Sequence, residues 1–177
     1  MPTAEQLTAD LVRASRHELR LSLNKIKEAL GHIRPEQAWQ RAHENENAIG
    51  NLLLHLAGNV RQWIVCGLGG AEGERDRPAE FAQREPLPIE EVFAKLESTV
   101  AEAEAVLEEM APAALLKSYP IQVYEVSGIH AILHVVTHFA EHTGQILWAV
   151  KRLTGDDLGL YSHLDAQPEQ AGETGQP

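Results

Sequence analysis

Four of the chain's nine histidines recur at every fourth residue in the segment 127–155, which otherwise has the pattern of an apolar helix. They are His130, His134, His138 and His142. On an α-helix, residues four apart lie one turn apart and differ by only about 40° around the axis. Two imidazole nitrogens at this spacing can bind one divalent ion at about 2.0–2.1 Å. The pattern contains three such pairs, and spacing alone does not choose among them.

Further ligands have to come from another helix, and His55 is the candidate. It lies within the apolar segment 48–68, which is predicted to be helical. A single histidine in an apolar helix is usually a hydrogen-bonded core residue, but the histidines of segment 127–155 favour the metal-ligand interpretation here. Gly50 and Gly58 each lower helix stability by roughly 1 kcal/mol relative to alanine, which suggests a close helix approach or room for a ligand.

Four segments with apolar residues at three- and four-residue steps predict four long helices. They span about residues 3–30, 48–68, 88–110 and 127–155. Asn45 or Asn47 is expected to cap the second helix, and Pro88 to begin the third. Ser127 and Gly155 are expected to bound the fourth. Helices of this kind each bury one apolar face against the others, so we expect an all-α domain.

The connectors between these helices differ in character. The apolar, β-branched segment 119–126 is too short to anchor a sheet by itself, and we expect an extended connector there. The longest break, 67–88, is rich in glycine and in charge, and a connector of this length is usually functional or mobile. Arg75 and Arg77 are expected to be solvated, with the alternative that one of them, or Asp76, folds back over the mouth of the site.

Charge and composition exclude several classes of function. The 177 residues hold 15 Lys and Arg against 26 Asp and Glu, a formal net charge of −11, which opposes binding to nucleic acid. The single cysteine, Cys66, excludes an internal disulfide framework and fits a reducing compartment. No apolar run approaches the 18 or more residues of a membrane span, and no signal-like segment opens the chain. We therefore expect one soluble, cytoplasmic domain with no membrane partner.

Two segments resemble the DinB/YfiT-like superfamily of metal-dependent four-helix-bundle proteins, namely NENAIGNLLLHLAGNVRQWI, which contains His55, and HVVTHFAEHTGQI, which contains His138 and His142. The likeness extends through the EF of the long connector to GLYSHL. It implies a four-helix bundle over residues 1–164, with a long crossover loop between helices 2 and 3, in an uncharacterised subgroup. We expect residues 165–177 to be a disordered tail.

The resemblance also implies a ligand set. Members of the superfamily typically bind one divalent metal through a histidine on the second helix and an H-x-x-x-H pair on the last core helix. By position these are His55, His138 and His142. His134 is then a hydrogen-bonding neighbour, an alternate ligand or a partly exposed polar residue, and His130 is structural.

The implied chemistry follows from the ligands. Three imidazoles suit zinc or nickel, and three neutral ligands leave the ion its full charge to acidify a bound water or thiol. Characterised members of the superfamily include thiol S-transferases and thiol-dependent isomerases, and homodimers are common among them. The resemblance therefore implies a homodimeric metal-dependent enzyme, such as a low-molecular-weight-thiol S-transferase acting on an electrophilic substrate, or a hydrolase. The alternatives are a non-catalytic, stress-associated bundle with a structural or vestigial metal, and a metal-free scaffold.

Overall fold

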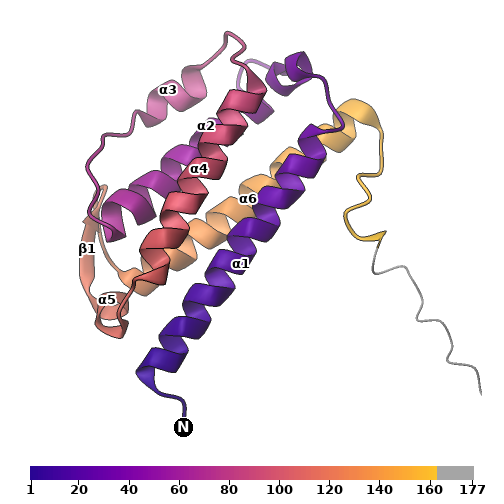
Figure 1. The fold of residues 1–177 in the computed structure, drawn as a ribbon. Helices are drawn as coiled ribbons and strands as arrows, with labels where there is room; N and C mark the ends of the chain where they lie inside the picture. The colour runs from indigo at the N-terminus through magenta and orange to yellow at the C-terminus, as the bar shows by residue number, and fades with distance from the viewer. Residues whose placement is uncertain (163–177) are drawn as a thin grey trace, which may run out of the picture.

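The structure, a computed structural model, describes residues 1–162 and is mostly helical. The long helices are α1 (Ala4–Leu30), α2 (Ile49–Val60), α4 (Ile89–Glu108) and α6 (Gly128–Thr154), as Figure 1 shows. α2 continues into η2 (Arg61–Leu68), whose turns are π-helical and therefore wider. The shorter elements are η1 (Pro35–Trp39), α3 (Arg77–Ala82), α5 (Pro112–Leu116), β1 (Ser118–Ile121) and β2 (Tyr124–Ser127).

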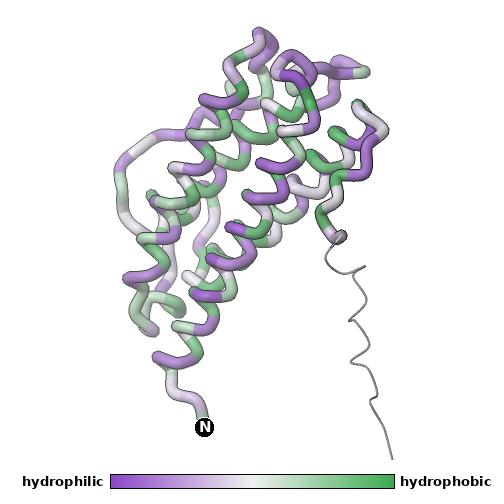
Figure 2. The backbone as a smooth tube through the Cα atoms, turned by 45° about the vertical axis from the view of Figure 1, so that its right-hand side comes forward, coloured by the Kyte–Doolittle hydropathy of each residue, from purple (hydrophilic) through white to green (hydrophobic). Residues whose placement is uncertain are grey.

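The long helices pack as two pairs that also contact each other. α1 lies against α6 and α2 against α4, while α1 also contacts α4 and α2 also contacts α6. Hydrophobic and hydrophilic residues alternate along these helices, so each has an apolar face to bury (Figure 2). The largest fully buried side chains come from all four helices and include Leu19, Ile26, Leu53, Leu56, Leu96, Phe139 and Ile146. The contact between α2 and α6 is the one that positions the candidate site.

The ends of α6 are set by the two residues that the sequence predicts. The Ser127 hydroxyl accepts a hydrogen bond from the backbone N–H of His130 at 3.2 Å and so caps the helix. Gly155 ends it with φ of 76°, a left-handed conformation that glycine adopts without strain. These caps fix the length of the helix that carries the histidine stripe.

The start of α2 differs from the prediction. Neither Asn45 nor Asn47 caps it, because Ala48 occupies the cap position. Ala48 has no side-chain acceptor, and Asn51 compensates by accepting a hydrogen bond from the Ala48 N–H at 3.1 Å. The prediction was wrong because the polar residue that completes this helix start lies inside the helix rather than before it.

The crossover between α2 and α4 contains a short helix, α3, that the sequence pattern did not predict. Asp76 caps it by accepting a hydrogen bond from the Ala79 N–H at 3.0 Å. The fully buried Asn51 side chain of α2 donates to the carbonyl oxygens of Glu80 (2.8 Å) and Gln83 (3.1 Å). These bonds fasten the crossover onto α2.

Residues 118–127 form an antiparallel β-hairpin rather than an unpaired extended connector. β1 and β2 pair with Tyr119 opposite Val126 and Ile121 opposite Tyr124. Gln122 makes the turn with φ of 57°. Tyr119, Ile121 and Val126 are buried, and β1 contacts η2. Strands this short gain stability from packing rather than from pairing alone, which explains why the pattern predicted the extension but not the pairing.

Some predictions fall outside these observations. The predicted domain end at residue 164 and the predicted tail at 165–177 lie outside the described residues, and so does His163, which is not among the predicted ligands. Within residues 1–162, the helices are too short or too polar to span a membrane.

Candidate metal centre

The structure brings together His55 from α2 with His138 and His142 from α6. One ring nitrogen of each lies within 4.8 Å of those of the other two. Nε2 of His55 lies 2.9 Å from Nε2 of His138. Two imidazole nitrogens bound to one tetrahedral ion lie about 3.4 Å apart. The separation of 2.9 Å is somewhat shorter than this value and the limit of 4.8 Å somewhat longer, so modest movements of the side chains would give a metal-binding geometry.

The three rings converge for two reasons, namely the spacing of His138 and His142 along α6 and the packing of α2 against α6. The rings of His138 and His142 lie one turn apart on α6, with centroids 4.4 Å apart and planes nearly perpendicular. The His55 ring reaches them from α2, with its centroid 5.0 Å from each. His55 is buried, whereas His138 and His142 are partly exposed, so the cluster is closed by α2 and open toward solvent along α6.

Burial keeps His138 and His142 neutral. It lowers the pKa of His138 to about 3, with smaller contributions from the neighbouring histidines and from Arg75. Burial also lowers the pKa of His142, partly offset by the hydrogen bond to Gln145. A neutral imidazole has a free nitrogen lone pair and is the form that binds a metal ion. The environment therefore prepares these side chains for coordination at neutral pH.

A buried ion pair lies behind His55. Arg75 donates from Nε to Glu80 Oε1 at 2.7 Å and from Nη2 to Glu80 Oε2 at 2.8 Å. His55 Nδ1 lies 3.0 Å from Glu80 Oε2 and 2.9 Å from Arg75 Nη2. Burial opposes ionisation of the Glu80 carboxyl, but the hydrogen bonds from Arg75 and His55 outweigh it, so its pKa lies below the usual value. The carboxylate is therefore ionised next to His55.

The crossover segment thus contributes to the site through Arg75, one of the alternatives that the sequence left open. Asp76 instead caps α3. Arg77 lies over the Phe81 ring, with its guanidinium carbon 4.9 Å from the centroid. Phe81 in turn packs against His55, with the ring centroids 4.6 Å apart. The crossover covers the side of His55 that faces away from His138.

His142 has a neutral hydrogen-bonding neighbour on its own helix. Its Nδ1 lies 2.8 Å from Oε1 of Gln145, and this amide oxygen can only accept, so Nδ1 carries the proton. The neutral ring then has its lone pair on Nε2. Two of the clustered histidines therefore have a side-chain oxygen beside Nδ1. For His55 it is the charged carboxylate of Glu80, and for His142 it is the neutral amide of Gln145.

Residues 6–164 match the model of the family described as "Protein of unknown function (DUF1572)". The chain belongs to the DUF1572 family. The fold is similar to that of a conserved protein from Enterococcus faecalis known from a crystal structure, with a TM-score of 0.69 and 14% sequence identity. The alignment covers 81% of the DUF1572 chain and 97% of the E. faecalis chain. No curated protein matches the sequence significantly.

His134 of the DUF1572 chain lies beside the cluster but is not part of it. Its ring stacks on Trp63, with centroids 3.9 Å apart, and its Nε2 lies 3.4 Å from the Asn59 side-chain nitrogen. Burial, then His130 and Arg75, lowers its pKa. His130 is exposed at the start of α6. His134 therefore faces the turn of α2 and η2 that follows His55, and it contacts His138 by stacking at 5.5 Å between centroids.

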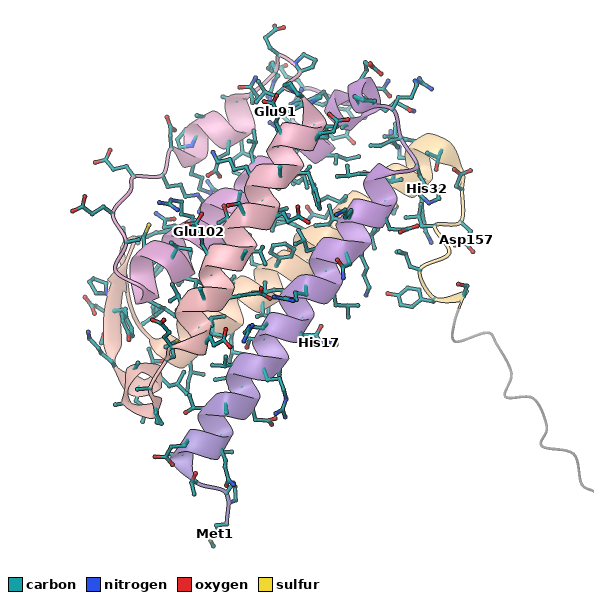
Figure 3. All side chains as sticks on the ribbon, viewed as in Figure 1. Met1, His17, His32, Glu91, Glu102 and Asp157 are labelled. Carbon is teal, nitrogen blue, oxygen red and sulfur yellow. The ribbon has the colours of Figure 1, made fainter. Side chains whose placement is uncertain are left out.

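His17, His32 and Cys66 are not part of the histidine cluster. His17 is exposed on α1 and His32 lies just beyond that helix, as Figure 3 shows. Cys66 lines a cavity of about 340 Å³ between α2, η2, the crossover and α4. Arg75 and Glu80 line the same cavity, and the three clustered histidines do not. The thiol of Cys66 is therefore not part of the histidine cluster.

Sequence reasoning missed Glu80 and Gln145 as site residues. A signal existed for Glu80, because an aspartate followed by a proline two residues later predicts a short capped helix that would present Glu80 on a defined face. Gln145 lies three residues after His142, a spacing that brings two helical side chains together. Neither signal identifies the histidine partner without the fold.

Proposed function

We propose that this DUF1572 protein binds one divalent transition-metal ion through His55, His138 and His142. The observation that carries the proposal is the convergence of three imidazole nitrogens from two packed helices within 4.8 Å. Imidazole suits zinc or nickel, whereas magnesium and calcium prefer oxygen ligands. The low pKa of His138 supports the proposal, because the ring needs no deprotonation at neutral pH.

The composition of the cluster supports an open coordination position. Among residues 1–162, no carboxylate or thiol joins the three histidines. Structural zinc sites are typically closed by four protein ligands, whereas catalytic sites have three and bind water or substrate at the fourth position. Neutral ligands leave the charge of the ion uncompensated, which lowers the pKa of a bound water or thiol. We therefore propose a metal-dependent enzyme that transfers a low-molecular-weight thiol to an electrophile, or one that hydrolyses a small substrate.

The same proposal places the chain in the DinB/YfiT-like superfamily with a four-helix-bundle architecture. In support, α1, α2, α4 and α6 each contact two of the others, and a crossover joins α2 to α4. The clustered histidines lie on the second and the last long helix, as in that superfamily.

Metal content tests the first step. Protein purified without chelator is expected to contain about one zinc or nickel ion per chain by elemental analysis. The full-length protein with no metal, and with no uptake of either ion at micromolar concentration, would contradict the proposal.

Cobalt(II) substitution tests the open position. A small thiol added to the cobalt protein should displace bound water and give a thiolate-to-metal charge-transfer band. The control is Cys66→Ser, which should keep the response, because Cys66 is not part of the histidine cluster. A cobalt spectrum unchanged by thiols and by small anions would indicate a closed site and favour the non-catalytic alternative.

A further inference from the structure

The buried pair formed by Arg75 and Glu80 has a defined relation to one ring nitrogen of His55. The side chains of all three are almost fully buried, with exposed fractions of 7% for Arg75, 11% for Glu80 and 4% for His55. Arg75 also donates to Gln62 Oε1 at 3.0 Å and to the His55 carbonyl oxygen at 3.3 Å. The guanidinium is therefore fixed by several acceptors and holds the carboxylate in one place.

Two proton arrangements of His55 are chemically available. If Nδ1 carries the proton, it donates to Glu80 Oε2, and Arg75 Nη2 donates to Glu80 and to the His55 carbonyl oxygen. If Nε2 carries the proton, Nδ1 accepts from Arg75 Nη2, and the Glu80 oxygen faces a nitrogen lone pair at 3.0 Å. In the first arrangement Nδ1 and Arg75 Nη2 are two donors 2.9 Å apart, but each has an acceptor, which is Glu80 Oε2 for Nδ1 and Glu80 Oε2 with the His55 carbonyl oxygen for Nη2. The His55 Nε2 lone pair can then accept a hydrogen bond from His138 Nε2 at 2.9 Å. The second arrangement turns a lone pair of Nδ1 toward the anionic Glu80 oxygen, so the first is favoured. Only the first leaves Nε2 free to bind a metal ion.

We propose that Glu80, held by Arg75, is a positioning residue that fixes the ring of His55 and its proton on Nδ1, with Nε2 as the metal-binding atom. The proposal rests on the metal site proposed above and adds the residues that prepare it. A carboxylate on the outer nitrogen of a ligating histidine orients the ring and raises the basicity of the ligand atom. The Arg75–Glu80 pair is neutral as a whole, so it adds no repulsion toward a cation.

Gly58 provides the space that this pair occupies. It lies three residues after His55 on α2, and an added Cβ would lie 2.7 Å from Arg75 Nε and in direct collision with the Glu80 carboxylate. An alanine here would displace the pair without altering its charges or any histidine. Gly144 is the matched control, because it lies two residues after His142 on α6 and an added Cβ would meet nothing within 4 Å.

The first test determines the His55 tautomer in metal-free protein. Nitrogen-15 labelling of histidine and long-range proton–nitrogen correlation spectra distinguish a protonated from an unprotonated ring nitrogen. The His55→Gln variant assigns the signals. We expect the proton on Nδ1 of His55, and a proton on Nε2 instead would overturn the proposal. This measurement involves no metal, so it remains decisive if the wild-type protein binds neither zinc nor nickel and the proposed function fails.

The second test measures zinc affinity by competition with a chromophoric chelator. The Arg75→Met/Glu80→Leu double variant removes both charges, because loss of Glu80 alone would leave a buried unpaired cation. We expect its zinc affinity to fall by about 10–100-fold, with His55 populating both tautomers. Gly58→Ala is expected to weaken zinc binding by about 10-fold, and Gly144→Ala to leave it unchanged. Folded double-variant and Gly58→Ala proteins with wild-type affinity and an unchanged His55 tautomer would overturn the proposal.

Discussion

Acid should destabilise the metal-free protein through its partly buried histidines, and His138 gives the clearest case. Burial, followed by the neighbouring histidines and Arg75, lowers its pKa from 6.5 to about 3. Between these two values the unfolded chain binds a proton that the folded chain does not. The free energy of unfolding therefore falls as the pH falls. The stabilising contribution is fully present above about pH 6.5 and is lost progressively toward about pH 3.

Between about pH 5 and about pH 7.5 the His138 ring of the folded chain stays neutral. The change in the free energy of unfolding over this range therefore depends mainly on protonation of His138 in the unfolded chain. A group that titrates at 6.5 only when unfolded changes the free energy of unfolding by about 2 kcal/mol between about pH 7.5 and about pH 5. Because the ring is partly exposed, solvent screening reduces the effect, and we expect about 1–2 kcal/mol. Burial also lowers the pKa values of His142 and His134, so these residues act in the same direction.

Urea unfolding of chelator-treated protein at these two pH values is the assay. Glutamine does not titrate in this range, so His138→Gln should lose about 1–2 kcal/mol less stability on acidification than the wild type. His17→Gln is the control for replacing a histidine by glutamine outside the cluster, because His17 is exposed on α1. Equal losses in the wild type and in His138→Gln, or a wild type that acid stabilises, would refute the reasoning.

Two further predictions concern the metal and the assembly. Stoichiometric zinc binding, measured by elemental analysis, should be abolished in each of His55→Ala, His138→Ala and His142→Ala. Zinc binding should be retained in His17→Ala, His32→Ala and His163→Ala. His134→Ala should weaken zinc binding by about 10–100-fold without abolishing it. A loss of zinc in His134→Ala as complete as that in His138→Ala would show that the assigned ligand pair on α6 is wrong. We also expect a homodimer, since Leu133 and Trp148 of α6 are 48% and 62% exposed. Light scattering that gave about 19.5 kDa at every concentration would contradict it.

The long helices were predictable because each repeats its apolar period over several turns, and burial of one stripe decides their structure. The short elements were not, because they depend on contacts with residues distant in the sequence. α3 is held by Asn51, whose amide nitrogen reaches two carbonyl oxygens about thirty residues further along the chain. The hairpin at 118–127 depends on the burial of Tyr119, Ile121 and Val126 in the same way.

The histidine stripe shows where spacing stops being informative. Its histidines all recur at the same four-residue spacing, so spacing does not show which of them bind a metal ion. Contacts with the facing helix have to distinguish the ligands from the others. His138 and His142 face His55, whereas His134 faces Asn59, one turn further along α2. The distinguishing information is therefore the residue type at each turn of α2 and the register between two helices that are some eighty residues apart. The superfamily resemblance supplied the ligand assignment, and the structure supplies the contacts that make it physically reasonable.

Glu80 is the harder case, because no period connects it to His55. The capped helix around it can be recognised from Asp76, but the sequence does not show which surface that helix covers. The readable clue is Gly58, since a glycine within a buried helix, three residues after a candidate ligand, leaves a space that another segment has to fill. In this fold the space is filled by the carboxylate of Glu80 and the guanidinium of Arg75. Gly58 therefore indicates from the sequence only that another group approaches α2 closely at this point, and the tertiary structure identifies that group.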